Sequence, residues 1–398
     1  MREIHSLIDA VLPEIVELRH DLHQHPELGY EETRTAAQVL AQLKKIPGLE
    51  VRTGVAGTGI VAVLAGDKTG PCVALRADMD ALPMAEQGDK PYRSQVEGKM
   101  HACGHDGHTS CLVGAARVLG ECADELEGPV KFIFQPAEEG GAGGKRMCQE
   151  GALTGPDVAA IFGLHGVPDM QVGQIFLRTG VALASADEFV IEVEGVGAHA
   201  AFPHHGIDTV YIAAQIVVAL QSIVARNTDP LDSVVVTIGQ IEAGTASNII
   251  PQTARLVGTV RALSEETRQK TIARVQDIAQ HTAAAFGGQA EVVFDENGYP
   301  ALSNDARARG VAEEIVREAL AGQIEPLELE TPMMGAEDFA FYSQRVPAFF
   351  FGLGLRSKGV DSYPMLHQPD FDFNDDALLC GIQMHVEIAR RFAKKWQP

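Results

Sequence analysis

Apolar residues recur with two different periods along the chain, and the period separates helices from strands. Residues 35–45 and 109–126 repeat apolar positions every three or four residues, which predicts amphipathic helices. Short runs that are apolar throughout predict buried strands. Up to about residue 180 the two kinds of segment alternate, which indicates an α/β sheet with helices on both faces. The strands expected in this part are residues 58–66, 72–78, 128–136 and 158–165.

The pattern changes in the middle of the chain. Alternating strands and two long helices follow in the order βαββαβ, that of a ferredoxin-like α+β unit. A helix at 304–322 and an apolar strand at 346–355 then return to the α/β pattern. We therefore expect a doubly wound α/β domain with a central sheet, residues 1–184 and 299–398, interrupted by an inserted domain, residues 185–298. The inserted elements are expected at residues 187–195, 207–225, 233–244, 253–262, 264–286 and 289–297.

Length and composition agree with two domains and narrow the choice of partners. The 398 residues are 45% hydrophobic and 22% charged, as in globular proteins, and exceed the size of one ordinary core. A formal net charge of −22 repels nucleic acid and anionic membranes, so we expect a small-molecule partner and neither of these. The sequence shows no signal-peptide pattern and no stretch approaching a membrane span. Six scattered cysteines without a CxxC pair fit a cytoplasmic protein.

Side chains typical of metal sites gather in loops and at the ends of predicted strands. Asp78 and His165 each close a predicted strand, and Glu138 and Glu139 follow another. In doubly wound sheets the site lies beyond the carboxyl ends of the strands, so these side chains should lie together. Thiolate, imidazole and carboxylate are ligands for zinc-like or manganese-like ions. Further candidates are Cys103 and His105, in a loop before a helix, and His367, in a loop far downstream.

The segment HACGHDGH, residues 101–108, could be a metal site, a redox thiol or an ordinary polar loop. A single histidine or cysteine is more often structural than a ligand, and only the convergence of several candidates favours a metal. Gly104 and Gly107 are expected to let neighbouring ligands turn toward one centre. His101 and His108 are expected to support the site or start the helix. Asp106 is as well suited to capping or orienting a ligand as to binding.

The two adjacent glutamates strengthen the metal interpretation. On a solvated surface Glu138 and Glu139 would simply repel each other, and the alternative is a glycine-rich surface turn. Beside a dication, one glutamate can bind the metal while the other accepts a proton from water. This division of tasks is the arrangement of a hydrolytic enzyme.

Taken together, these motifs resemble the dimetal aminoacylase, hippurate hydrolase and carboxypeptidase superfamily. The similarity is greatest to the branch that hydrolyses N-acyl amino acids, including hippurate and auxin–amino acid conjugates. The motifs occur in order from Arg19 to Phe373 and are specific jointly, since no single one would suffice. They are RHDLHQHPELGYEE, ALRADMDALP, MHACGHDGHT, QPAEEGGAGG, GLHG, AHAAFPHHGID, TASNIIP, MGAEDFAFY and LHQPDFDF.

The resemblance implies a cofactor and a set of roles. The cofactor would be one or two divalent ions of zinc, manganese or cobalt, and the inserted domain would be a lid or dimerisation domain in a homodimer or homotetramer. Glu138 would be the general base, and Asp78 would orient a ligand without binding the metal. Other branches have a His-x-Asp motif where this chain has Arg76, so that position supplies no ligand and Cys103 takes the role. The implied ligands are Cys103, His105, Glu139, His165 and His367.

The resemblance also implies substrate contacts in the inserted domain and near residue 335. His199 would donate a hydrogen bond to the oxyanion, in its own subunit or in the partner's. Asn248 resembles a substrate-contacting residue. Arg261 could pair with a substrate carboxylate through two hydrogen bonds, or it could be an exposed strand arginine. Gly335 would bring the backbone close to the substrate. Relatives often have serine at the position of Ala336, so substrate choice near that loop stays open.

The expected reaction is metal-dependent hydrolysis of the amide bond of an N-acyl amino acid, which gives a carboxylic acid and a free amino acid. A dipeptidase or carboxypeptidase with the same dimetal chemistry is the alternative. A non-catalytic metal-binding protein on this fold is less favoured, because such a protein should have lost the base or ligands, and all are present here.

Overall fold

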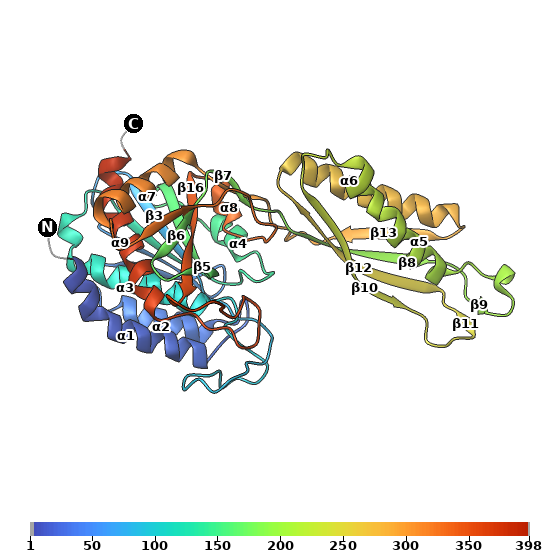
Figure 1. Cartoon of the computed structure of the whole chain (residues 1–398), viewed down its shortest axis with the longest axis horizontal. Coiled ribbons are helices and arrows are strands. Elements are labelled where there is room, and N and C mark those ends of the chain that lie inside the picture. Colours follow the sequence, from blue (N-terminus) through green and yellow to red (C-terminus); the bar gives the residue numbers. More distant parts are fainter. Residues whose placement is uncertain (1–3, 397–398) are drawn as a thin grey trace. The chain divides into compact units, whose positions relative to one another are not determined.

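The computed structural model describes residues 4–396, which divide into two compact units (Figure 1). The larger unit contains the chain up to Gly180, the segment Ser303–Glu330, and the chain from Asp338 onward. The smaller unit contains Val181–Leu302 and Thr331–Glu337. Each unit has its own cluster of buried apolar side chains, as domains do. The sequence pattern gave no reason to place residues 331–337 in the smaller unit.

An eight-stranded sheet forms the centre of the larger unit. The strands predicted from the apolar runs are all present in it, and three further strands extend it. In spatial order the strands are β1 (Glu50–Val55), β2 (Gly59–Leu64), β4 (Val130–Gln135), β3 (Cys72–Asp78), β5 (Val158–Gln171), β16 (Ala348–Arg356), β6 (Gln174–Leu177) and β15 (Glu325–Glu328).

The strands β4, β3, β5 and β16 run parallel to one another, and β15 runs parallel to β6. The pairs β1–β2, β2–β4 and β6–β16 are antiparallel. Parallel neighbours bring their carboxyl ends to one edge of the sheet, which is where the candidate side chains lie. The expectation that His165 closes a strand is wrong. β5 continues past His165 to Gln171, because β16 stays paired with it, with Gly352 opposite His165.

The helix α3 packs on the central strands β3, β4 and β5, and α9 packs on β3 and β16 (Figure 1). α1 lies against α3. The helix α3 begins at His105, four residues earlier than its expected start at Thr109, and α9 was not predicted. The helices of the larger unit are α1 (Ile4–Gln24), α2 (Thr33–Leu43), α3 (His105–Glu121), η1 (Ala123–Glu125), α4 (Gly143–Gln149), α7 (Ala306–Ala319), α8 (Ala340–Ser343) and α9 (Asp376–Lys395).

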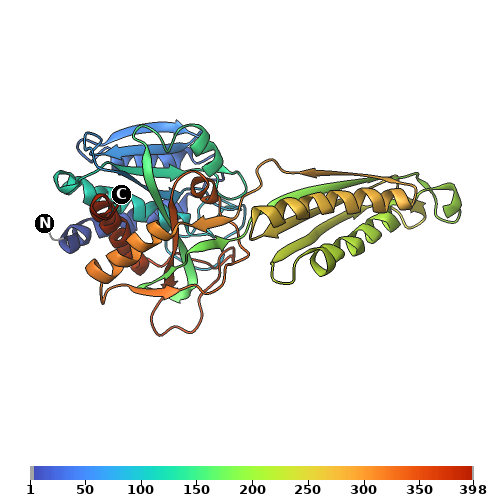
Figure 2. The ribbon, with the colours of Figure 1, turned by 90° about the horizontal axis from the view of Figure 1, so that it is seen from above.

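The smaller unit contains a four-stranded antiparallel sheet with two helices side by side on one face (Figure 2). Its main elements follow the predicted order βαββαβ. They are β8 (Asp187–Glu194), α5 (Thr209–Ser222), β10 (Val234–Ala243), β12 (Thr253–Ala262), α6 (Glu265–Ala285) and β13 (Gln289–Phe294). Shorter elements are β7 (Gly180–Leu183), β9 (Ala198–His199), η2 (Pro203–His205), η3 (Ile223–Asn227) and β11 (Ile249–Ile250). β14 (Leu302–Asn304), which pairs with β7, begins at the last residue of the segment Val181–Leu302 and continues into the larger unit.

One helical segment of the smaller unit has the length and apolar composition of a membrane span, which the sequence analysis did not expect. Within residues 4–396, Thr209–Asn227 meets the length and composition of a membrane span, so the expectation that no stretch reaches that length is wrong. Its buried side chains, among them Ile212, Ile216 and Leu220, pack in the core of the smaller unit. Only 33% of the apolar window is buried, so this helix also presents apolar side chains outward.

Candidate metal centre

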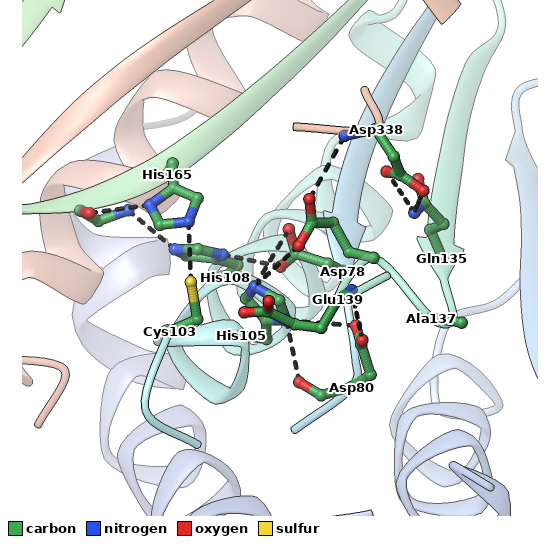
Figure 3. A network of polar contacts seen from close by, with 12 residues as sticks. Asp78, Asp80, Cys103, His105, His108, Gln135, Ala137, Glu139, His165 and Asp338 are labelled. Carbon is green, nitrogen blue, oxygen red and sulfur yellow. Dashed lines mark hydrogen bonds and ion pairs between the residues drawn. The ribbon is translucent and has the colours of Figure 1, made fainter. Parts of the chain in front are cut away.

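The five side chains expected to bind metal lie together in the larger unit, and Figure 3 shows four of them, Cys103, His105, Glu139 and His165. The ligand atoms of Cys103, His105 and His165 lie within 4.8 Å of one another, and so do those of Cys103, Glu139 and His367. Cys103 Sγ is 3.4 Å from His165 Nε2, and Glu139 Oε1 is 3.2 Å from His367 Nε2. Cys103 belongs to both groups and therefore links them.

The backbone at Gly104 and at His367 brings these loops together. Gly104 has a φ of +86°, a left-handed conformation that favours glycine, and helix α3 starts immediately after it. His367 has a φ of +62°, and its N–H donates to the carbonyl of Ala102 at 2.9 Å. The expectation that Gly107 turns the chain is wrong. It lies inside α3, where a Cβ atom would come within 2.2 Å of the Phe373 ring.

His105 offers one ring nitrogen to the centre. Its Nδ1 donates to the carbonyl of Asp80 at 2.9 Å, while its buried Nε2 has no hydrogen-bond partner within residues 4–396. That Nε2 lies 3.8 Å from Asp78 Oδ2 and 4.0 Å from Glu138 Oε2. Burial disfavours protonation, but Asp78 and Asp80 outweigh it and raise the pKa of His105 to about 10. An unpartnered imidazole nitrogen among carboxylates is a site for a cation.

His108 supports the site and has no nitrogen left for a metal. Its Nδ1 donates to Asp78 Oδ1 at 2.7 Å, and its Nε2 accepts the N–H of Gly166 at 2.8 Å. Burial lowers the pKa of His108 to about 4, which agrees with a neutral ring that donates once and accepts once. Asp78 Oδ2 accepts from Arg76 at 2.7 Å, so both carboxylate oxygens are held.

Charges around Asp78 keep it ionised. Burial alone would raise its pKa, but the neighbouring His105 and Arg76 hold the pKa of Asp78 well below its ordinary value. The other acid of the segment, Asp106, belongs to none of the candidate metal groups found among the described residues. It accepts from His23 at 2.9 Å and from Arg19 at 3.3 Å, and so ties helix α1 to the start of α3.

Two carboxylates hold the backbone of the loop that carries the paired glutamates. Glu32 accepts the N–H of Ala137 at 2.8 Å, and Asp80 accepts the N–H of Glu139 at 2.8 Å. Glu138 is buried, and its Oε1 accepts the N–H of Asp338 at 3.3 Å. Its ligand atom lies within 4.8 Å of those of His105 and Glu139. A carboxylate with no predicted ligand role therefore stands beside the predicted ligands.

In the smaller unit, His199 and Asn248 lie next to each other. β9 pairs with β11, with His199 opposite Ile249, and the N–H of Ala200 donates to the carbonyl of Asn248 at 3.0 Å. The N–H of Ala201 donates to His199 Nδ1 at 3.1 Å. In the neutral ring the proton must then sit on Nε2, which becomes a hydrogen-bond donor.

Arg261 and Gly335 lie at the other end of the smaller unit. Arg261 is on β12, eight residues beyond Thr253, the end next to β11. At about 3.4 Å per residue this separates Arg261 from that end by about 27 Å. Gly335 accepts the N–H of Ala184 at 2.9 Å, and the next residue, Ser185, donates to the carbonyl of Ala262 at 2.8 Å. The four candidates therefore form two separate pairs.

Comparison with known proteins identifies the family. The model of peptidase family M20/M25/M40 matches residues 74–391. This chain belongs to that family. The match covers most of the larger unit and the whole of Val181–Leu302 in the smaller one.

Relatives of this M20-family chain cover almost its full length. An N-acetyl-L-cysteine deacetylase of Bacillus subtilis (strain 168) is 40% identical over 378 residues, 95% of this chain and 88% of that protein. The IAA-amino acid hydrolase ILR1-like 4 of Arabidopsis thaliana is 40% identical over 381 residues, 95% of this chain and 85% of that protein. The crystal structure of the Bacillus subtilis YXEP protein, described as a dinuclear metal binding peptidase, is 35% identical, covers 97% of this chain and 99% of its own, and has a TM-score of 0.81.

Sequence reasoning missed several residues that hold this M20-family centre together. Arg76 was set aside because it cannot bind metal, yet it stands two residues before Asp78 on the same face of β3, which predicts contact. Asp80 repeats that spacing after Asp78. Asp338 had no local signal, because its partner Arg76 is 262 residues away. The missed residues are Glu32, Arg76, Asp80, Gln135 and Asp338.

Proposed function

We propose that this protein is a metal-dependent amidohydrolase that cleaves the amide bond of N-acyl amino acids into a carboxylic acid and a free amino acid. The observation that carries the proposal is the buried His105 Nε2, facing Asp78 and Glu138 with the other predicted ligands around it. The names of the relatives support the substrate class, because both act on amides of amino acids. A small-molecule substrate also suits a chain with a net charge of −22.

The residues fit a divalent metal cofactor. Cys103, His105, Glu139, His165 and His367 would hold one or two ions, and their thiol, imidazole and carboxylate groups suit zinc, manganese or cobalt. When bound, such an ion activates water and polarises the amide carbonyl. Asp78 has both oxygens engaged, with His108 and with Arg76, which supports a carboxylate that orients its neighbours without binding the metal itself.

Glu138 is the proposed general base. It carries no predicted ligand role, it is buried, and its Oε1 is fixed by the N–H of Asp338. A carboxylate held in this way can take the proton of the attacking water and pass it to the leaving nitrogen. The backbone bonds at Ala137 and Glu139 keep the loop in place during both transfers.

His199 is the proposed donor to the developing oxyanion. The bond from Ala201 to Nδ1 leaves the proton on Nε2, and a neutral N–H donor can stabilise negative charge on the former carbonyl oxygen. Asn248 would contact the substrate beside it. Arg261 would bind the substrate carboxylate, and Gly335, three residues along the chain from Asp338, would line the site.

The separation of the two pairs supports a homodimer. An N-acyl amino acid spans two or three residue lengths, roughly 10 Å. Within one chain the pair Arg261 and Gly335 lies about 27 Å from the pair His199 and Asn248, so one substrate cannot contact both. We therefore propose that each substrate meets Arg261 and Gly335 of one chain and the partner subunit's His199 and Asn248. The outward apolar side chains of α5, such as Val218, would lie in the dimer interface. A homotetramer could be built from two such dimers.

The smaller unit would then act as the lid or dimerisation domain. The compact unit Val181–Leu302 supports the proposed domain at residues 185–298, with residues 1–184 and 299–398 as the catalytic domain. All six cysteines are free, which fits the reducing conditions of the cytoplasm.

A substrate panel on metal-free protein restored with single metals tests the proposal. Benzoyl-glycine, N-acetyl amino acids and free dipeptides would each be assayed after adding zinc, manganese or cobalt. We expect the N-acyl amino acids to be hydrolysed and the chelated protein to be inactive. Turnover of dipeptides alone would favour the dipeptidase alternative, and binding of metal without any turnover would favour a non-catalytic protein.

Glu138→Gln tests the base. The substitution keeps the size of the side chain but removes its basicity, so the rate should fall by at least about 100-fold. Metal content per chain is measured on the same samples by mass spectrometry. Retained turnover at wild-type metal content would rule out Glu138.

Mixed dimers test whether His199 acts in the partner's site. His199→Ala and Glu138→Gln are each expected to be inactive as homodimers. After subunit exchange, one of the two sites in a hybrid combines an intact Glu138 with an intact His199 from the other chain. Recovery of activity supports action across the dimer, whereas no recovery after proven exchange argues for action within one chain or for no role.

A further inference from the structure

Arg76 is completely buried and binds three groups through separate nitrogens. Its Nη1 donates to Asp78 Oδ2 at 2.7 Å, its Nη2 to Asp338 Oδ1 at 2.9 Å, and its Nε to Gln135 Oε1 at 2.9 Å. Figure 3 labels these three partners. Asp78 and Arg76 are two residues apart on β3, so both side chains leave the same face of the strand. Gln135 ends the neighbouring strand β4, directly opposite Asp78.

Asp338 makes several further hydrogen bonds in this network. Its carboxylate also accepts from the Gln135 amide at 2.7 and 2.8 Å and from the N–H of Gly144 at 2.7 Å. Its own N–H donates to Glu138 Oε1 at 3.3 Å. A Cβ atom at Gly144 would come within 2.8 Å of the Asp338 carbonyl oxygen, so this approach requires glycine. Movement of the Asp338 side chain would therefore move the N–H that holds the proposed base.

We propose that Arg76 and Asp338 form a buried positioning pair that fixes Asp78, on the metal side, and Glu138, the base, in one arrangement. The inference rests on the proposed function for its kinetic part only. Neither residue touches the reacting atoms. Arg76 sets the carboxylate that orients His108, and Asp338 sets the backbone donor to Glu138. Through this pair, the position of the Asp78 carboxylate is linked to the position of the Glu138 carboxylate.

The shape of the arginine side chain, and not its charge alone, is needed for this task. A guanidinium presents its donors in a rigid planar fork, so it can hold Asp78, Asp338 and Gln135 at once. A lysine ammonium keeps the positive charge but is a single point on a flexible stem, and cannot span the same three acceptors. Arg76→Lys therefore separates positioning from charge balance.

The test compares Arg76→Lys and Asp338→Asn with wild type and with the double variant. Loss of the orienting groups around a metal site typically costs about 10–100-fold in metal affinity or activity. We expect Arg76→Lys to lower kcat by that factor with KM little changed, and to weaken manganese binding to the metal-free protein in calorimetry. Because the two residues act as a unit, the double variant should be no worse than the poorer single variant.

Lys131→Met is the matched control. Lys131 is a buried cation on β4, in the same sheet, but its Nζ binds the carbonyls of Thr154 and Pro156 and no residue of the centre. We expect it to lower the unfolding temperature while leaving kcat, KM and manganese affinity unchanged. The control therefore distinguishes a general loss of stability from the loss of kcat and manganese affinity expected of Arg76→Lys.

Arg76→Lys with wild-type kcat and manganese affinity would overturn the proposal and leave charge balance as the role of Arg76. Fully additive losses in the double variant would also overturn it. If Arg76→Lys does not fold by circular dichroism, Asp338→Asn, which changes shape little, decides the same question. If wild type binds manganese but hydrolyses no N-acyl amino acid, the proposed function fails, while the calorimetric comparison still decides whether the pair positions the metal site.

Discussion

Gly107→Ala should destabilise the larger unit even though alanine is the better helix former. The added Cβ would lie 2.2, 2.3 and 2.5 Å from three ring atoms of Phe373. Carbon atoms in contact are about 3.5–4.0 Å apart, so the ring or the helix must retreat by more than 1 Å. Phe373 is completely buried and also lies against Gly104, where a Cβ would be 3.2 Å from it. The ring therefore has little room to move.

The expected magnitude follows from two opposing effects. Replacing a helical glycine by alanine stabilises by about 1 kcal/mol. Overpacking a filled core costs about 1–3 kcal/mol, and three contacts this short belong at the upper end. The free energy of unfolding should therefore fall by about 2 kcal/mol. The shift also moves the first turn of α3, so manganese binding by His105 should weaken.

Equilibrium urea unfolding of the metal-free protein measures this effect, with Gly310→Ala as the control. Gly310 lies within helix α7, and a Cβ atom there meets nothing within 4 Å. Gly310→Ala should raise the free energy of unfolding by about 0.5–1 kcal/mol. If Gly107→Ala is as stable as Gly310→Ala, the packing argument for Gly107 is wrong.

Two further predictions concern the contact between His23 and Asp106 and the candidate metal ligand Cys103. Burial opposes protonation of His23, but Asp106 outweighs it and raises the pKa of His23 to about 9 from 6.5, which corresponds to about 3 kcal/mol. That stabilisation is present below pH 6.5 and lost as the pH rises through 9, so His23→Gln should cost most at pH 6 and little near pH 10 in urea unfolding. Cys103→Ser should lower metal content per chain after dialysis and reduce the stabilisation by metal, about 2.7 kcal/mol at 100 times Kd, whereas Cys148→Ser should change neither.

Sequence reasoning located the centre because topology alone brings strand ends together. Asp78 ends β3, and Glu138 follows β4, its parallel neighbour, so no knowledge of side-chain contacts was needed to place them side by side. His165 was placed correctly for a partly wrong reason. It lies within β5 and not at its end, but β5 pairs directly with β3, so the residue still lies beside Asp78 in the sheet.

The contacts that hold these side chains depend on packing between distant parts of the chain. Arg76 meets Asp338 across 262 residues, and Glu32 meets Ala137 across 105. No periodicity links such pairs. The glycine at 107 shows the same limit. A glycine near a candidate metal ligand suggests a turn, but the constraint here is the ring of Phe373, far along the chain. The hydrophobic period and the strand order predict which segments lie near one another. Which side chains then form hydrogen bonds depends on three-dimensional packing between distant segments.

The five predicted metal ligands lie in one unit, which has a consequence for the stability of each unit. All five candidate ligands belong to the larger unit but come from four distant parts of its sequence, so they are close only when that unit is folded. They are Cys103 with His105, Glu139, His165 and His367. The free energy of metal binding therefore adds to the free energy of folding of the larger unit. The smaller unit contains none of these candidate ligands, so an ion should stabilise the larger unit without direct effect on the smaller one. Hydrogen exchange with and without manganese should accordingly slow in β3 and α3 and stay unchanged in α6, whereas equal slowing in both units would mean that the metal centre also depends on the smaller unit.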